Sequence, residues 1–109
     1  MKLNAKELTV GNYVEYANIR CKVKSYSNSG FLETDGLTAP ITTYDPIKIT
    51  DDLLSDLGYT KVKDHFHLKL HCIWKCNDIY MCDKNGTILT YLHQLQNLLY
   101  FTKGIEITL

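Results

Sequence analysis

The chain has 109 residues, 45% of them hydrophobic, which is the size and composition of one small domain that can bury a core without disulfides or a structural metal. Twelve basic and twelve acidic residues cancel to a formal net charge of zero. Because a neutral chain lacks the positive field that attracts duplex DNA or an anionic membrane, we expect a single domain, residues 1–109, with neither of these as a partner.

The N-terminal sequence bears on the compartment. Met1 to Asn4 lead into polar sequence, and no apolar run along the chain has the length of a signal peptide or a membrane span. We therefore expect a cytoplasmic protein. The four cysteines lie in apolar or alternating runs, which favours reduced core thiols over disulfides: Cys21, Cys72, Cys76 and Cys82.

The first half of the chain has the pattern of short strands separated by turn residues. We expect strands at Tyr13 to Tyr16, Ile19 to Tyr26, Phe31 to Thr34 and Ile47 to Ile49. The strand that begins at Ile19 alternates most regularly, with one set of residues on each face: Ile19, Cys21 and Val23 against Arg20, Lys22, Lys24 and Tyr26. This pattern predicts a small bent antiparallel sheet with the strands of an SH3-like half-barrel.

A short central helix follows these strands. Thr50 can cap its first turn, and Asp51 and Asp52 there complement the helix dipole. Gly58 can end the helix, with Tyr59 folding back onto its last turn.

A second group of strands lies between this helix and the C-terminal region. From Phe66 to Cys76 apolar residues occupy every second position, which predicts one strand with a wholly apolar face. His65, His67 and His71 would then lie on the opposite, solvent-facing side. Two further strands are expected at Ile79 to Cys82 and Thr87 to Leu89.

The C-terminal stretch predicts a helix followed by a short strand. Thr90 can cap the helix and Gly104 can end it in a left-handed turn. An apolar stripe lies at helical spacing: Tyr91, Leu92, Leu95, Leu98, Leu99 and Thr102. We expect Leu95 and Leu98 to be buried against the sheet. The predicted fold class is α+β: a small bent antiparallel sheet with a short central helix and a C-terminal helix packed on it.

Histidines and cysteines are the residues that could ligate a metal. If Phe66 to Cys76 is one strand, its histidines point away from Cys72 and Cys76, so a mixed site would need a break in the strand. The spacing Cys-x-x-Cys is also absent. We therefore predict no metal site, with cysteines in the core and histidines facing solvent.

The sequence carries no signature of an enzyme. His71 adjoins Cys72 in the chain but would point to the opposite face of a strand, so it could not activate the thiol. Glycine-rich phosphate loops and the common hydrolase and metalloprotease motifs are absent. We predict a protein that is not an enzyme and needs no cofactor.

Two groups of residues are candidates for binding. Eight tyrosines and one tryptophan offer stacking surfaces for bases or protein partners, and Arg20, Lys22 and Lys24 form a basic row beside Tyr26. On the C-terminal helix four polar residues lie three or four positions apart, on the face opposite the leucines: His93, Gln96, Asn97 and Tyr100. Each group also has an alternative interpretation without a binding role. The tyrosines would line the edge of the core, and the polar faces of the sheet and of the helix would only be solvated. Because uncharged helical faces tend to be covered, we predict a ligand site there and a homo-oligomer.

Four stretches of the chain resemble a family of small uncharacterised proteins of gut anaerobes, their phages and their mobile elements. These are residues 8–14, 44–50, 53–59 and, above all, 91–104 with its His-Gln-Leu-Gln-Asn-Leu core, whereas residues 65–89 match poorly. The resemblance implies a phage or mobile-element setting and supplies no catalytic residues.

The expected function is therefore that of a non-enzymatic binding protein. Small phage proteins often act by binding, so by analogy we expect counter-defence by sequestering a nucleotide immune signal. The second hypothesis is that the chain is a protein-interaction subunit or an inhibitor that blocks a host protein. The third is a single-stranded nucleic-acid binder that uses the Arg20, Lys22 and Lys24 row.

Overall fold

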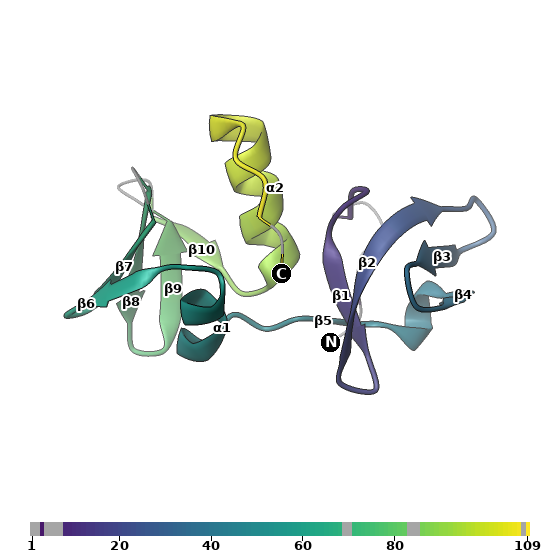
Figure 1. Ribbon diagram of the computed structural model, residues 1–109, viewed down its shortest axis with the longest axis horizontal. Coiled ribbons are helices and arrows are strands. Elements are labelled where there is room, and N and C mark those ends of the chain that lie inside the picture. Colours follow the sequence, from purple (N-terminus) through teal and green to yellow (C-terminus); the bar gives the residue numbers. More distant parts are fainter. Residues whose placement is uncertain (1–2, 4–7, 69–70, 83–85, 108) are drawn as a thin grey trace.

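The computed structural model describes residues 3, 8–68, 71–82, 86–107 and 109 (Figure 1). These residues form two five-stranded antiparallel sheets and two α-helices, which confirms the predicted α+β class. The two sheets lie at opposite ends of the molecule, and the C-terminal helix stands between them (Figure 1).

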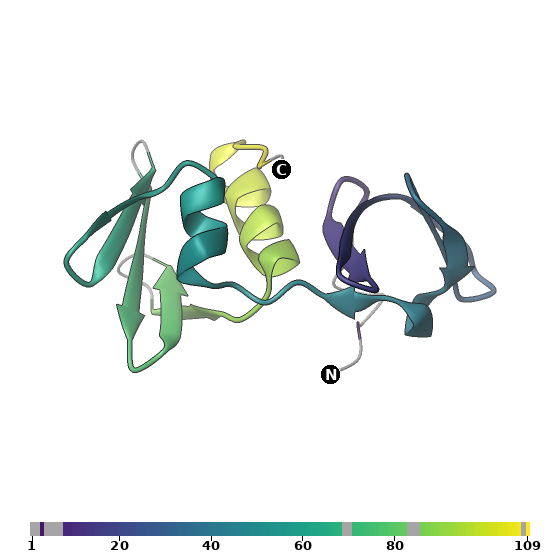
Figure 2. The ribbon, with the colours of Figure 1, turned by 60° about the horizontal axis from the view of Figure 1, so that its bottom comes forward.

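The N-terminal half builds the first sheet, with the strand order β4-β3-β2-β1-β5. Its strands are β1 (Tyr13–Tyr16), β2 (Ile19–Tyr26), β3 (Phe31–Thr34), β4 (Thr38–Pro40) and β5 (Asp45–Pro46), with a 3₁₀ turn η2 (Ile41–Thr43) before β5. The sheet curls strongly (Figure 2), and its inner side holds one core cluster: Val14, Cys21, Val23, Leu32, Ala39 and Tyr44. The predicted bent N-terminal sheet is confirmed.

Strand β2 differs from the predicted alternation at its end. The register with β3 shifts between Val23 and Ser25, so Lys24 has no Cα partner on β3. Tyr26 then pairs with Leu32, a core residue, and lies on the core side of the sheet instead of beside Arg20 and Lys22. The prediction that Tyr26 shares a face with the basic row is wrong, because one extra residue reverses the alternation beyond it.

The strand expected at Ile47 to Ile49 is also absent. Strand β5 ends at Pro46, and Lys48 makes only an isolated bridge to Tyr91. Ile47 and Ile49 are nevertheless 5% and 1% exposed. They are buried because this segment crosses from one sheet to the other and packs on the helices.

The second sheet has the order β10-β9-β8-β7-β6. Its strands are β6 (Thr60–Val62), β7 (His65–Leu68), β8 (His71–Cys76), β9 (Ile79–Cys82) and β10 (Thr87–Leu89). The run predicted as one strand is thus a hairpin of β7 and β8, in which Phe66 pairs with Ile73 and Leu68 with His71. Because paired residues share a face, the inward positions change from even-numbered on β7 to odd-numbered on β8. His71 is therefore buried, and Cys72, Trp74 and Cys76 lie on the outer face.

Both α-helices border the inner face of the second sheet (Figure 2). Thr50 caps α1 (Asp51–Asp56) by accepting a hydrogen bond from the Leu53 amide, as predicted. The helix α2 (Leu92–Lys103) begins after Tyr91, not Thr90, and the Gln94 side chain accepts hydrogen bonds from the backbone amides of both residues. Gly104 ends α2 with a left-handed φ of 65°, as expected.

The predicted burial of the leucine stripe is confirmed for Leu95, which is fully buried, whereas Leu98 is partly buried. After α2 the expected strand does not form in the described residues. The terminal segment instead packs back, so that Ile107 joins the core of the second sheet and the Leu109 amide donates to the Tyr13 hydroxyl. None of the helices in the described ranges is long and apolar enough to cross a membrane.

Candidate ligand-binding cleft

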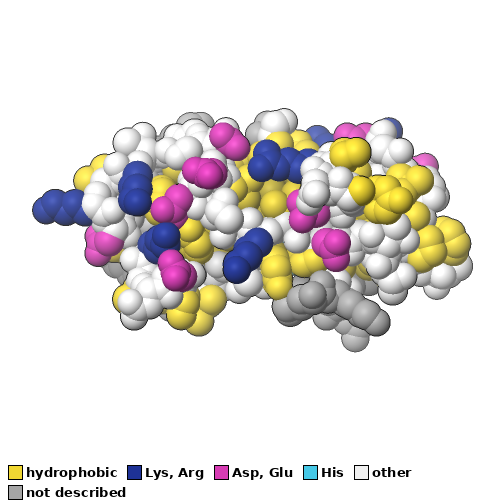
Figure 3. Space-filling view, turned by 90° about the horizontal axis from the view of Figure 1, so that it is seen from below, with side chains coloured by type: hydrophobic (Ala, Val, Ile, Leu, Met, Phe, Trp, Pro, Cys, Tyr) yellow, Lys and Arg dark blue, Asp and Glu magenta, His cyan; other side chains and the backbone are white. Residues whose placement is uncertain are grey.

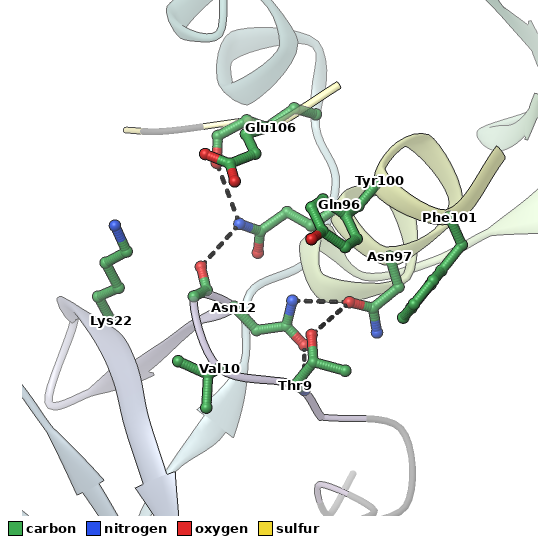
Figure 4. A pocket seen from close by; sticks show the side chains of 11 residues that line it. Thr9, Val10, Asn12, Lys22, Gln96, Asn97, Tyr100, Phe101 and Glu106 are labelled. Atoms are coloured by element: carbon green, nitrogen blue, oxygen red, sulfur yellow. Dashed lines mark hydrogen bonds between the residues drawn. The ribbon is translucent and has the colours of Figure 1, made fainter. Parts of the chain in front are cut away.

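A cleft of about 480 Å³ opens between the first sheet and α2 (Figure 4). Its wall is formed by an N-terminal loop, one residue of β2, one side of α2 and the terminal segment. Four of the eight predicted binding residues line it: Lys22, Gln96, Asn97 and Tyr100. The other lining residues were not predicted: Thr9, Val10, Gly11, Asn12, Phe101, Glu106 and Ile107.

Gln96 is the residue that joins the walls of this cleft. Its side-chain oxygen accepts a hydrogen bond of 2.9 Å from the Tyr13 amide. Its side-chain nitrogen donates to the carbonyls of Gly11 and Ile107, at 3.1 and 3.2 Å. The side chain is only 6% exposed, so its hydrogen-bonding atoms hold the loop, β1 and the terminal segment together. Both ends of the Gln96 amide are thus used within the protein, although the residue lines the cleft as predicted.

Asn97 performs a similar role for the N-terminal loop. Its side-chain oxygen accepts from the Thr9 hydroxyl at 2.9 Å and from the Asn12 side-chain nitrogen at 2.8 Å (Figure 4). The Asn12 side-chain oxygen accepts in turn from the Thr9 amide. These bonds tie the loop to α2 and form the polar floor of the cleft without a ligand.

The exposed part of the cleft is aromatic and apolar. Tyr100 and Phe101 on the last turns of α2 are 53% and 70% exposed, and their rings meet edge to face with centroids 5.4 Å apart. Val10 on the facing loop is 73% exposed. Lys22 and Glu106 bring one charge of each sign to the lining. A flat ring could stack on this pair while a polar group meets Lys22.

The remaining predicted site residues do not line the cleft. His93 is 1% exposed and its ring stacks on that of Tyr91, because α2 is covered on more than one side where it passes between the sheets. Its expected place on an exposed polar face is therefore wrong. Arg20 lies 4.0 Å from Asp56, and Lys24 and Tyr26 lie further along β2.

The charge is mixed on the face of the molecule that Figure 3 shows. On the face seen from below, basic and acidic side chains are interspersed (Figure 3), and the described part of that face carries no continuous basic patch.

An ion-pair cluster that the sequence did not predict joins α1 to the second sheet. Asp51 accepts hydrogen bonds from the Tyr80 hydroxyl at 2.5 Å and from the Lys75 ammonium at 3.1 Å, with Lys61 at 3.4 Å. The hydrogen bond from Tyr80, aided by Lys75 and Lys61, holds the pKa of Asp51 below its usual value. Burial, together with this bond to Asp51, raises the pKa of Tyr80. The cluster is not part of the cleft, and we interpret it as a structural connection between α1 and the second sheet.

The β7–β8 hairpin brings His67 and Cys72 to one face, which the one-strand interpretation excluded, and His71 lies near Cys82 of β9. The Cys72 sulfur lies 3.0 Å from Nδ1 of His67, and the Cys82 sulfur lies 3.9 Å from Nδ1 of His71. All four cysteines are free thiols. Among the described residues no group of three or more histidine, cysteine or acidic side chains is placed to hold a metal ion.

Comparison of the chain with protein-family models, with curated proteins and with solved structures finds no match.

Proposed function

We propose that the protein is a non-enzymatic binding protein that holds a small nucleotide in the cleft beside α2. The observation that carries this proposal is the exposed ring pair of Tyr100 and Phe101 at a cleft of about 480 Å³, within the size range of small-molecule sites. Base stacking on such rings tolerates different bases and needs no amide from the protein. Gln96 and Asn97 support the site by fixing its floor.

The charges of the lining favour a ligand with few phosphates. Lys22 supplies one positive group that can meet a phosphate, and no ion pair holds its side chain among the described residues. Glu106 repels further negative charge. A nucleoside monophosphate or a cyclic nucleotide therefore fits the cleft better than a triphosphate.

The biological role that we propose for this site is sequestration of the nucleotide. A protein that binds a nucleotide without converting it lowers its free concentration, and the resemblance to phage and mobile-element proteins points to a host immune signal as the nucleotide. This activity would take place in the cytoplasm.

The test is calorimetric titration with a panel of nucleosides, monophosphates, cyclic nucleotides and triphosphates. Tyr100→Ala should weaken binding about tenfold, since stacking on one ring contributes roughly 1 to 3 kcal/mol per base. Tyr26→Ala is the matched control, because Tyr26 is 45% exposed but lies outside the cleft, and it should bind like wild type. Absence of binding across the panel, or equal losses in both variants, would contradict the proposal.

We also propose that the protein is a homo-oligomer. The exposed rings of Tyr100 and Phe101 are large apolar groups at a cleft mouth, and a second copy seated over them would close the cleft. Light scattering should give a mass above that of one chain, and Phe101→Glu should reduce it. A monomeric wild type at micromolar concentration would rule this out.

The outer face of the second sheet favours the alternative of a protein-interaction subunit or inhibitor. Cross-strand pairing aligns a row without lysine, arginine or acidic residues over all its strands, which we call the outer row: Val62, His65, Trp74, Met81 and Ile88. Trp74 is 40% and Ile88 60% exposed. Host proteins captured by wild type and by Tyr100→Ala, but not by Trp74→Ser, would support this function. Equal capture by all three would count against it.

A further inference from the structure

The β7–β8 hairpin brings a thiol and an imidazole together on the outer face of the second sheet. Cys72 pairs across the strands with His67, and its sulfur lies 3.0 Å from Nδ1 of that histidine. Both side chains are half-buried, so the pair is held by the sheet but open on one side. With the ring proton on Nε2, Nδ1 can accept the thiol hydrogen.

The surroundings hold His67 in this position. Its ring packs edge to face on that of His65, with centroids 4.3 Å apart, and His65 lies 4.4 Å from the Trp74 ring. Asp64 approaches Nδ1 of His65 at 3.3 Å. A nucleophile next to a base that is itself oriented by other groups is the arrangement found at reactive cysteines.

The other three cysteines serve as internal references: Cys82 has a histidine at 3.9 Å but that pair is buried, and Cys76 and Cys21 have no histidine at their sulfur among the described residues. Cys76 lies two positions beyond Trp74 on the same face and is exposed, and its sulfur makes no hydrogen bond within the described part of the chain. Cys21 and Cys82 are 3% and 7% exposed. Exposure alone would therefore make Cys76 the most reactive thiol of the protein.

We propose that Cys72 is a modification site for low-molecular-weight disulfides, with His67 as its general base. The Cys72 sulfur attacks one sulfur of the disulfide while its proton passes to Nδ1 of His67. A new bond forms between Cys72 and that sulfur, the original disulfide bond breaks, and the departing thiolate takes the proton from His67. One disulfide replaces another, so no further oxidant is needed.

The product remains a mixed disulfide. Cys76 is four residues along the same strand, about 13 Å away at the usual strand rise, which is too far for an internal disulfide. Cys82 lies on the opposite face of the sheet. The small-molecule adduct would therefore stay on Cys72, beside the outer row. This inference is independent of the nucleotide cleft.

The test is competitive labelling of the reduced, folded protein with limiting iodoacetamide, and separately with oxidised glutathione, read per cysteine by peptide mass spectrometry. Cys72 should react at least about tenfold faster than Cys76. This ratio lies below the roughly 100-fold rate increase that is the lower end of the range for a positioned general base. His67→Gln should remove this advantage and leave the Cys76 rate unchanged. Oxidised glutathione should form its mixed disulfide at Cys72 first.

The buried thiols report whether the fold persists, because Cys21 and Cys82 should stay unlabelled in every valid sample. Cys72 reacting no faster than Cys76 in wild type would overturn the proposal without any variant. A His67→Gln protein with buried thiols still protected and Cys72 still fast would overturn the role of the histidine.

Discussion

At the scale of single residues, the sequence suggests that Gln96 binds a ligand, whereas its hydrogen bonds hold the segments around the cleft together. Its three hydrogen bonds join segments that are 83, 85 and 11 positions away in the chain. The loop, β1 and the terminal segment meet at this amide. A ligand site at the cleft therefore depends on Gln96 even though a ligand would touch other residues.

Replacing Gln96 by leucine should lower the free energy of unfolding by about 3 kcal/mol, because the buried backbone groups it satisfies would lose their partners. Urea denaturation followed by circular dichroism measures the change. Tyr100→Ala on the same helix is the control and should shift stability by less than about 0.5 kcal/mol, since Tyr100 is exposed. Equal effects of the two variants would refute the assigned role of Gln96.

Asp51 makes stability depend on pH at the acidic end. Its pKa in the folded protein is lowered from 3.8, chiefly by the hydrogen bond from Tyr80 and then by Lys75. A lowered folded pKa means that the stabilisation is present above the ordinary pKa and is lost as the pH falls through the folded value. Wild type should therefore lose stability steeply below about pH 4.

The measurement is the urea midpoint at neutral pH and at about pH 3, with Asp51→Asn and the matched control Asp52→Asn. Asp51→Asn should be destabilised by roughly 1 kcal/mol at neutral pH, a figure already reduced for the partial exposure of the carboxylate. It should also show a shallower acid loss than wild type. Asp52 is exposed in the same turn, so Asp52→Asn should have the same urea midpoints as wild type at both pH values. A steep acid loss retained in Asp51→Asn would assign it to another carboxylate.

At the scale of elements, the sequence predicts what local chemistry determines. The cap at Thr50, the stop at Gly104 and the first three strands follow from turn residues, capping side chains and alternation. The break between β7 and β8 could not be found this way, because no glycine, proline or asparagine lies between Leu68 and His71 and the alternation of the sequence continues past it. Because the outward-facing positions change from odd-numbered on β7 to even-numbered on β8, Cys72 and His67 lie next to each other on the outer face.

The candidate site was only partly predictable for a related reason. Helical spacing placed Gln96, Asn97 and Tyr100 on one side of α2, and the structure does bring them to one cleft with Lys22. Spacing cannot say which other segment covers a face. In the structure His93 is buried, and the first sheet, the N-terminal loop and the terminal segment use the side-chain amides of Gln96 and Asn97.

The helix α2 contributes leucines to the core of the second sheet. Leu95 is fully buried in the cluster that contains Phe66 and Ile73. Leu95→Ala should lower the free energy of unfolding by about 2 to 5 kcal/mol, through lost burial and the cavity left behind. Thermal melts compared with Leu98→Ala, where the side chain is only partly buried, should show the larger loss for Leu95. A melt of Leu95→Ala that matches wild type would contradict the packing.

At the scale of the whole molecule, the two sheets have separate cores joined by a smaller cluster. The joining residues come from β1, the crossing segment and both helices: Tyr13, Ile47, Leu53 and Leu92. Backbone bonds from Leu92 to Ile47 and from Ile49 to Thr90 tie the start of α2 to the same segment. The cleft depends on this junction, because its walls belong to both sides.

If the chain is the single domain that its length predicts, both sheets should unfold in one transition. The molecule carries a probe on each side: Trp74, its only tryptophan, lies in the second sheet, and the buried thiol of Cys21 lies in the first. Tryptophan fluorescence and Cys21 labelling followed against urea should give coincident midpoints in wild type. Leu92→Ala, which empties the junction, should lower stability by about 2 to 5 kcal/mol and separate the two midpoints. Leu99→Ala, equally buried but inside the second core, should lower both midpoints together. Separate midpoints in wild type would show two domains and place the cleft at their boundary.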